Sequence, residues 1–312
     1  MHMPKITVVI PLYNKARHIE RALTSVLAQK MPAYEILVID DGSTDGSGDI
    51  VAQQFGDQVK LIRQTNQGVA HARNTGIANA TGAYIAFLDA DDEWSPHFLS
   101  EITDLIFEFP HCHMYATAYQ FVTSEQTIDL RNPTLSHSQP RFAMDRFYHH
   151  AASGDLPFSM SSIAVKTYLA RTIGGFDTQQ EMGEDQDFYI RCLERSSIAY
   201  SQRRFSRYYL SADQRACNRN VPKSECAYSQ RVASRIHGVS RQEANDRIAF
   251  CASHIFDLIR RNLEVGDWRT AGRLLQDKRL TCDKTRLAYW HTRYLLTRCQ
   301  PSRFSSDITM AA

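Results

Sequence analysis

The sequence has little of what marks several common classes of protein. Its seven cysteines are an odd number without a Cys-x-x-Cys pair, which argues against a disulfide framework or a zinc site and favours reduced thiols. Only 14 glycines and 10 prolines occur in 312 residues, which excludes collagen-like and low-complexity chains. No apolar run reaches the roughly 18 residues of a membrane-spanning helix. The short apolar stretch near the N-terminus lacks a small-residue cleavage site, so it predicts a core strand rather than a secretory signal.

The composition is that of a globular protein with an uneven distribution of charge. Hydrophobic residues make up 43% and charged residues 22%, enough to bury a core and to exclude a largely disordered chain. Residues 1–200 hold 15 Lys and Arg against 24 Asp and Glu, a net charge of −9. Residues 201–312 hold 21 against 10, a net charge of +11. This asymmetry suggests that the two parts have different tasks.

Strand and helix patterns alternate over the first 125 residues. Runs of β-branched residues are followed by apolar residues at helical spacing, and Ser95 with Pro96 is typical of a helix start. This order predicts an α/β protein with a mainly parallel central sheet covered on both faces. We expect strands at 6–12, 35–40, 59–62, 83–88 and 114–122, and helices at 19–27, 50–55, 69–80 and 95–107.

The rest of the chain changes character twice. Residues 123–140 are polar and predict a loop, whereas 158–165 has a strand pattern and 184–194 a helical one. After residue 221 the apolar residues recur at helical spacing, which predicts a helical appendage. We therefore expect one α/β domain over residues 1–220 and a basic helical extension over residues 221–312.

An acidic cluster, Asp89-Ala90-Asp91-Asp92, directly follows the predicted strand 83–88. Carboxylates are poor strand formers and are costly to bury. Open α/β sheets bind ligands beyond the carboxyl ends of their strands, and an Asp-x-Asp pair there can hold a hard divalent cation. The alternative is that the acids precede a helix, whose dipole favours negative charge, which explains Asp92 and Glu93 better than Asp89.

A second acidic segment, Asp40-Asp41-Gly42-Ser43, follows the predicted strand 35–40. A carboxylate at a strand end can accept hydrogen bonds from a base or a ribose, and glycine allows close approach. An ordinary turn or helix cap would have the same residues. The spacing fits neither the phosphate-binding P-loop nor the dinucleotide fingerprint.

Two further segments carry charged side chains at predicted helix starts. Arg73 lies one turn into the helix that opens after Gly68, where a guanidinium can meet a phosphate, stack on a base or pair with a nearby carboxylate. Glu184 and Asp185 lie at the start of the helix 184–194, where one carboxylate beside others can be tuned as a general base. Helix-start acids are also common for their dipole alone.

These segments together resemble the inverting nucleotide-sugar glycosyltransferases of family 2. The resemblance is carried by VVIPLYN, VIDDGSTDGS, NQGVAHARN, FLDADD and GGFD followed by GEDQDF, and it covers residues 5 to about 200. It implies the GT-A fold, with a nucleotide-binding half at 1–122 and an acceptor-binding half at 123–220. It also implies a metal-dependent hexosyl- or N-acetylhexosaminyl-transferase, with UDP as the expected nucleotide of the donor and GDP and dTDP as open alternatives.

The resemblance also implies roles for individual residues. The nucleotide pocket would be lined by Pro11 and Tyr13, with Asp41 on the base and Arg73 near the nucleotide. In the D-x-D motif, Asp91 would bind Mg²⁺ or Mn²⁺ and Asp89 the ribose or the metal, with Ala90 between them. Asp185 would be the catalytic base, with Glu184 as the alternative. The acceptor and donor sugar would lie near Gly174, Gly175 and Phe176.

One departure from the family pattern concerns the metal. Many relatives have a His beyond the Glu-Asp helix, but the comparable stretch here, residues 207–213, contains none. Tyr209 or Asp213 would have to replace it, or the metal would keep another water. The loops 123–160 and 200–225 are expected to carry acceptor specificity.

The expected setting is cytoplasmic, with a glycan or lipid-linked acceptor and a role in cell-surface polysaccharide biosynthesis. For the basic extension, the alternatives are peripheral contact with an anionic membrane, a homo-oligomer interface, or a solvated surface paired with the acidic half. No motif supports nucleic-acid binding. The rival function is a non-catalytic sugar-nucleotide-binding or scaffold protein.

Overall fold

The computed structural model describes residues 3–135, 138–180, 182–211 and 221–299. Its contacts divide the chain into two compact units. The first comprises residues 1–145 and 155–213, and the second comprises residues 146–154 and 214–312. The sequence places a boundary at residue 220 and gives no sign that residues 146–154 join the helical unit.

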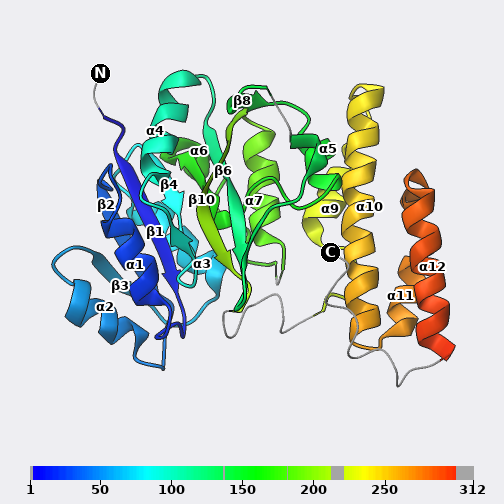
Figure 1. Cartoon of the computed structure of the whole chain (residues 1–312), viewed down its shortest axis with the longest axis horizontal. Coiled ribbons are helices and arrows are strands. Elements are labelled where there is room, and N and C mark those ends of the chain that lie inside the picture. Colours follow the sequence, from blue (N-terminus) through cyan, green and yellow to red (C-terminus); the bar gives the residue numbers. More distant parts are fainter. Residues whose placement is uncertain (1–2, 136–137, 181, 212–220, 300–312) are drawn as a thin grey trace. The chain divides into compact units, whose positions relative to one another are not determined.

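The first unit is built on a ten-stranded sheet (Figure 1). Its strands are β1 (Ile6–Leu12), β2 (Glu35–Asp40), β3 (Lys60–Arg63), β4 (Tyr84–Phe87), β5 (Glu93–Trp94), β6 (Met114–Val122), β7 (Thr127–Asp129), β8 (Arg141–Met144), β9 (Ile163–Lys166) and β10 (Ile198–Tyr209). Their main order is β3-β2-β1-β4-β9-β6-β10-β5, with β7 on β6 and β8 on β10.

The α/β fold agrees with the sequence prediction, but only half of the sheet is parallel. The strands β3, β2, β1 and β4 are parallel, as expected. In the other half β6 and β10 are parallel, whereas β5, β7, β8 and β9 pair antiparallel. Parallel pairing needs a long crossover, usually a helix. The regular alternation of strands and helices ends near residue 122, and the sheet is mixed beyond it.

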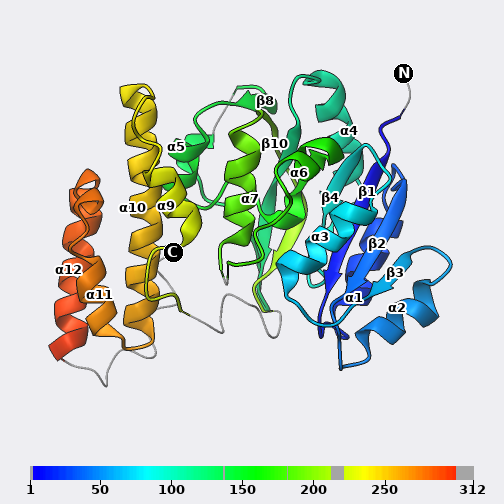
Figure 2. The same cartoon turned by 180° about the vertical axis from the view of Figure 1, so that it is seen from behind.

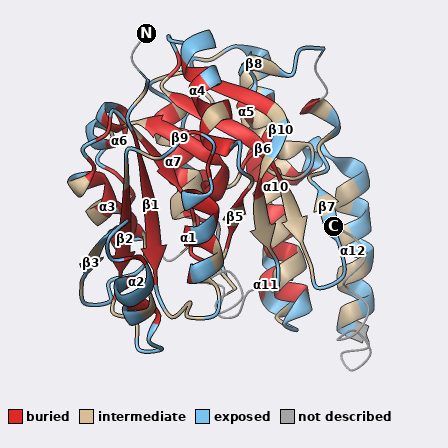
Figure 3. Cartoon of the chain, turned by 60° about the vertical axis from the view of Figure 1, so that its left-hand side comes forward, coloured by how far each residue is buried: buried red, intermediate tan, exposed pale blue. Residues whose placement is uncertain are grey.

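Strand β1 lies between β2 and β4 inside the sheet, and every one of its seven residues is buried (Figure 3). It pairs with β2 from Thr7 to Leu12 but with β4 only from Ile6 to Val9. Pro11 therefore lies where β4 no longer pairs, and its missing N–H group costs little there. The strand order reverses direction at β1, and such switch points are where α/β sheets bind ligands.

Helices cover both faces of the sheet. The helices α1 (Ile19–Leu27), α2 (Ser47–Phe55) and α4 (Phe98–Glu108) share one core with the alternate β1 residues Ile6, Val8 and Ile10. The other face carries α3 (Val69–Asn79), α6 (Thr167–Thr172) and α7 (Glu184–Leu193), as Figure 2 shows. The predicted helix start at Ser95 is wrong: α4 begins at Phe98, whose N–H donates to the Ser95 carbonyl in a preceding turn.

Three segments that the sequence predicts as loops or as a strand have a different secondary structure in part. The predicted loop 123–140 contains β7 and a 3₁₀ turn at Pro133–Leu135. The predicted strand at 158–165 begins with a 3₁₀ turn at Met160–Ser162 before β9. The predicted specificity loop 200–225 begins inside β10, and its residues 212–220 lie outside the described residues. Exposed edge strands carry polar residues, and their composition resembles that of a loop.

The second unit is helical, as predicted. Its elements are α5 (Phe147–Ala152), α9 (Ala227–Ala233), α10 (Arg241–Glu264), α11 (Trp268–Leu274), a 3₁₀ turn at Lys278–Cys282 and α12 (Lys284–Cys299). The core forms around Ile255, Phe256 and Ile259 of α10. Side-chain caps begin two helices, because Ser240 accepts from the Glu243 N–H and Asp267 from the Thr270 N–H. Among the residues described, no helix is both long and apolar enough to span a membrane.

Candidate active site

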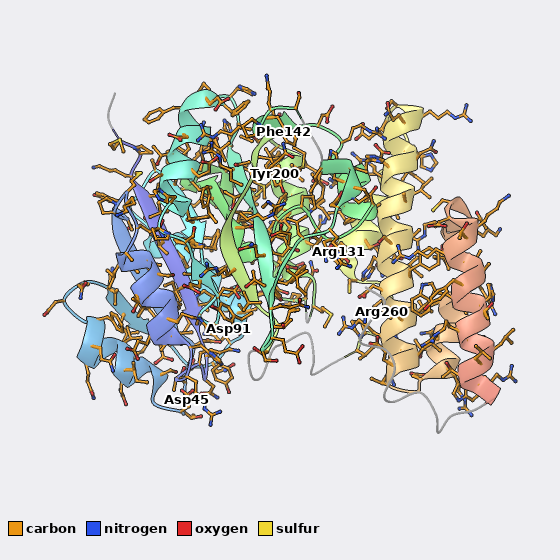
Figure 4. The ribbon with its side chains drawn as sticks, viewed as in Figure 1. Asp45, Asp91, Arg131, Phe142, Tyr200 and Arg260 are labelled. Atoms are coloured by element: carbon orange, nitrogen blue, oxygen red, sulfur yellow. The ribbon has the colours of Figure 1, made fainter. Side chains whose placement is uncertain are left out.

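The four charged segments meet at the carboxyl ends of the parallel strands. Asp45 follows β2 and Asp91 follows β4, and Figure 4 labels both at the same end of the sheet. Phe142 and Tyr200 mark its opposite end in the same view. Residues that are up to 117 positions apart in the sequence are joined here by hydrogen bonds.

Arg73 of α3 connects its own segment to the acidic segment at Asp89 and to the Glu184-Asp185 segment. Its side chain is only 4% exposed, and its two terminal nitrogens donate to Asp89 Oδ1 at 2.8 Å and to Glu184 Oε1 at 3.0 Å. Burial alone would lower the pKa of Arg73, but the charges of Asp89 and Glu184 outweigh it and raise that pKa. Arg73 thus pairs with carboxylates in the described structure and stays charged at any physiological pH.

Asp185 neighbours this network at the start of α7. The preceding Gly183 has a φ of +82°, which turns the chain sharply into the helix. Burial and, next, the charge of Glu184 raise the pKa of Asp185 to about 7, although the charge of Arg73 opposes the shift. Such a carboxyl can exchange a proton near neutral pH, which is what a general base requires.

The acidic tip, defined here as residues 89–93, has a positive or hydrogen-bonding partner for each carboxylate. Asp91 Oδ2 lies 2.7 Å from the Lys15 ammonium, with 16% and 13% of the two side chains exposed. The Asp91 carbonyl accepts from Arg21, while the Asp89 N–H donates to Ser161. The small side chain of Ala90 is buried between them.

Asp92 and Glu93 have structural partners rather than open positions. Asp92 is 1% exposed and accepts from the Ser161 hydroxyl and from the Tyr209 N–H. Burial, then the charges of Asp89 and Asp91, raise the pKa of Asp92 well above its usual range. Glu93 accepts from the Tyr209 hydroxyl at 2.6 Å. These two acids do not lie at a helix start, because Glu93 belongs to β5 and α4 begins only at Phe98.

Asp41 fastens the segment that leads into α3. It is 2% exposed, and its carboxylate accepts from the Gln64 amide and from the N–H groups of Gln67 and Gly68, at 2.8 to 2.9 Å. Gly68 has a φ of +92° at the helix start. A carboxylate has about four acceptor positions, so one remains beyond these three donors.

Pro11 and Tyr13 lead into the loop beside Asp41. Pro11 is buried, whereas 39% of Tyr13 is exposed. The next residue, Asn14, has a φ of +51° and accepts from the Thr44 N–H, while its own N–H donates to Ser43. The loops after β1 and β2 are thereby held to each other.

The Gly-Gly-Phe segment, residues 174–176, packs against Arg73 through the ring of Phe176. Phe176 is 2% exposed, stacks on Phe188 with 4.1 Å between ring centroids, and lies 5.3 Å from the Arg73 guanidinium. Asn74 binds both the N–H and the carbonyl of Phe176. Gly174 and Gly175 precede it with positive φ angles. In the described structure Phe176 is thus a core residue.

Several residues near the tip were not predicted. Lys15 contacts the Asp91 carboxylate, Arg21 contacts the Asp91 carbonyl, and Ser161 contacts Asp92. The one sequence signal for these contacts is the basic residues that follow Asn14. Tyr209, one of the two replacements considered for the absent His, binds Asp92 and Glu93. The other, Asp213, lies outside the described residues.

Asp91 is the residue of the tip whose carboxylate could serve as a ligand for a divalent cation. Within the described ranges no three His, Cys, Asp or Glu side chains are grouped as a metal site. Asp91 offers hard carboxylate oxygens, and the Lys15 ammonium already lies against one of them as a stand-in cation. The remaining ligands of such an ion would come from a diphosphate and water.

Comparisons with known proteins identify the family of the chain. The sequence model of glycosyl transferase family 2 matches residues 7–161, about half of the chain. The chain belongs to this family. An uncharacterized glycosyltransferase of Nostoc sp. is 51% identical over 104 residues, which are 32% of each protein. The glycosyltransferase AglE of Haloferax volcanii is 38% identical over 143 residues, 40% of this chain and 47% of that protein. The chain thus spans from about a third to half of these relatives.

The fold itself is shared with a solved structure. Residues 1–349 of S. aureus TarS, crystallised in complex with UDP-GlcNAc, superimpose with a TM-score of 0.69 over 98% of this chain and 95% of that one. The sequence identity is 18%, so the likeness establishes the fold. The predicted α/β fold with a helical C-terminal region is confirmed, as is membership of the glycosyltransferase family.

Proposed function

We propose that the chain is an inverting glycosyltransferase that moves a sugar from a nucleoside diphosphate sugar to an acceptor hydroxyl. The observation that carries this is the pairing of Arg73 with Asp89 and Glu184 beside Asp185, whose pKa is about 7. A metal-proximal carboxylate, a fixed cation and a poised base are the groups that a single displacement needs.

Asp185 takes the proton of the acceptor hydroxyl as its oxygen attacks the anomeric carbon. Glu184 is the alternative base, although its pairing with Arg73 leaves it less free to accept a proton. Arg73 holds Asp89 and Glu184 in place, and the loop Pro11–Tyr13 and Asp41 line the nucleoside. Asp91 would hold a Mg²⁺ or Mn²⁺ ion, whose positive charge would stabilise the departing diphosphate. Gly174, Gly175 and Phe176 shape the floor beneath the sugar.

Structures with the same fold support the proposed donor class, and the relatives support the proposed acceptor class. TarS has been crystallised with UDP-GlcNAc and with UDP, which favours a UDP-sugar and an N-acetylhexosaminyl or hexosyl group here. A Bacillus subtilis relative, 35% identical over 127 residues, has a name that proposes teichuronic acid biosynthesis. We therefore propose a glycan or lipid-linked acceptor and a part in cell-surface polysaccharide synthesis.

The basic helical extension is proposed to serve the approach to that acceptor. A lipid-linked glycan lies at a membrane surface, and a cationic unit binds anionic headgroups there. This implies a cytoplasmic protein that contacts the inner face of the membrane. A homo-oligomer through the same helices is the competing use of this surface.

A thermal-shift panel of nucleotide sugars with and without Mn²⁺ tests the proposal. A ligand that binds only the folded state raises the melting temperature, so UDP-sugars with Mn²⁺ should give the largest rise. Release of UDP on addition of a glycan acceptor then separates a transferase from a non-catalytic binder. No shift with any nucleotide sugar would overturn the proposal.

A further inference from the structure

Each outer carboxylate of the acidic tip is neutralised by a cation of the chain itself. Asp89 pairs with Arg73, Asp91 with Lys15 at 2.7 Å, and Glu93 with Arg207 at 3.4 Å. Asp91 is the one that the proposed function assigns to a divalent cation. Any ion that binds Asp91 therefore meets an ammonium group already in contact with the same carboxylate.

The position of Lys15 is fixed by its loop. The N–H of Asn14 donates to Ser43, the N–H of Ala16 donates to Asp45 at 2.8 Å, and the Asn14 side chain accepts from Thr44. Both neighbours of Lys15 are thus tied to the loop after β2. With only 13% of its side chain exposed, Lys15 belongs to the site rather than to the open surface.

We propose that Lys15 is a resident counter-cation that competes with the divalent ion for Asp91 and pairs with the donor diphosphate once displaced. This rests on the proposed function, which it deepens by naming what sets the affinity for metal and donor. In the absence of donor, Lys15 holds Asp91 against the repulsion of its acidic neighbours. When metal and donor arrive together, the ammonium exchanges a carboxylate for a phosphate oxygen nearby.

This exchange predicts that removing the Lys15 ammonium changes the affinity for metal and the affinity for nucleotide in opposite directions. Two unit charges about 4 Å apart interact by several kcal/mol at the effective dielectric of a protein surface. Removing the ammonium leaves Asp91 unpaired, so Mn²⁺ alone should bind at least about tenfold more tightly. UDP without metal should bind at least about fivefold more weakly, because its diphosphate loses a positive partner.

The test titrates metal-free protein with Mn²⁺ alone, followed by electron paramagnetic resonance, and with UDP in EDTA, followed by calorimetry. The variants are Lys15→Met and the charge-conserving Lys15→Arg. Lys60→Met on the exposed strand β3 is the matched control. We expect tighter Mn²⁺ and weaker UDP binding for Lys15→Met alone, with Lys15→Arg and Lys60→Met close to wild type.

Equal or weaker Mn²⁺ binding by a folded Lys15→Met would overturn the inference, as would the same gain in Lys60→Met. Melting temperatures in EDTA and in Mn²⁺ show whether each variant folds, and Lys15→Gln replaces Lys15→Met if the latter does not. Failure of the proposed function looks different: wild type would then bind no UDP-sugar with Mn²⁺. If wild type binds it and Lys15→Met shows no gain in Mn²⁺ affinity, only the role of Lys15 is rejected.

Discussion

At the scale of single residues, the reactivity of the site depends on how one carboxyl is held. Asp185 lies against Glu184 and near Arg73, so its proton affinity is set by burial and two opposing charges. A base of this kind contributes roughly 10²- to 10⁴-fold to a reaction rate. We expect Asp185→Asn to lower the transfer rate by at least about 10²-fold while UDP binding, measured by calorimetry, changes less than about twofold.

The matched control is Asp57→Asn, which removes an exposed carboxylate of the same unit. It should transfer at the wild-type rate. If Asp185→Asn retains full turnover, the base is not Asp185, and Glu184→Gln becomes the variant to measure.

The raised pKa of Asp185 also fixes the pH dependence of both activity and stability. Activity needs the carboxylate, so the transfer rate should rise with pH through about 7 and level off above it. Stability has the opposite sign. The folded pKa exceeds the usual 3.8, so the native state binds more protons and loses stability as the pH rises from about 4 to about 7.

Asp185→Asn should therefore be more stable than wild type at pH 8 by about 1–2 kcal/mol, a value discounted because the carboxyl is partly open to water. Urea unfolding at pH 5 and pH 8 measures this, and the difference should shrink at pH 5. A flat rate profile between pH 5.5 and 8.5 would contradict the assignment.

At the scale of elements, the segment before α7 is coupled to α3 by close backbone approach. A methyl group on Gly175 would lie 2.2 Å from the Asn74 side-chain oxygen, and its φ is +68°. Gly174 has a φ of +81° but no atom within 4 Å of such a group. We expect Gly175→Ala to destabilise the protein by about 2–4 kcal/mol and Gly174→Ala by only about 1 kcal/mol, by urea unfolding.

The same pair of variants separates strain from steric contact. Gly175→Ala displaces Asn74 next to Arg73, so it should also lower the transfer rate, whereas Gly174→Ala should not. Equal losses of stability in the two variants would mean that backbone strain alone matters and that the contact with Asn74 does not.

The elements that sequence patterns predicted are those with long apolar runs. Strand β1 was visible as a nearly unbroken apolar run, and helix α1 was visible because it buries one regular stripe of residues. Strand β5 has only two residues, too few to show a period, and forms by pairing with the distant strand β10. The candidate site follows the same rule. The acidic tip was visible from its composition, whereas Lys15 and Ser161 reach it through tertiary contacts.

At the scale of the whole molecule, several arginines of the basic helical unit are paired with acidic residues of the same unit. Arg146 pairs with Asp246, Arg260 with Asp257 and Glu264, and Arg279 with Glu225 and Asp277. These arginines are poorly available to a partner. The basic surface proposed for membranes must come from other residues of the unit.

One group of residues in this unit has the chemistry of a membrane interface. Trp268 is 37% exposed, and the guanidinium groups of Arg269 and Arg298 lie 5.3 and 5.6 Å from its ring. Two apolar residues of the same unit, Val265 at the end of α10 and Leu295 of α12, are also exposed. Tryptophan and arginine together suit a headgroup region, since the ring is amphipathic and the cations meet phosphates.

We therefore expect the protein to float with vesicles of equal phosphatidylglycerol and phosphatidylcholine, but not with pure phosphatidylcholine. Each basic residue near an anionic surface is worth about 1 kcal/mol, so two arginines and a tryptophan give weak binding that about 0.5 M salt reverses. Trp268→Ala with Arg298→Gln should abolish flotation and leave the transfer rate to a soluble acceptor unchanged. Flotation that survives this double substitution would place the contact elsewhere on the helices. Absence from both kinds of vesicle would mean that the cationic extension acts in solution, where a concentration-dependent mass in light scattering would favour its use between copies of the chain.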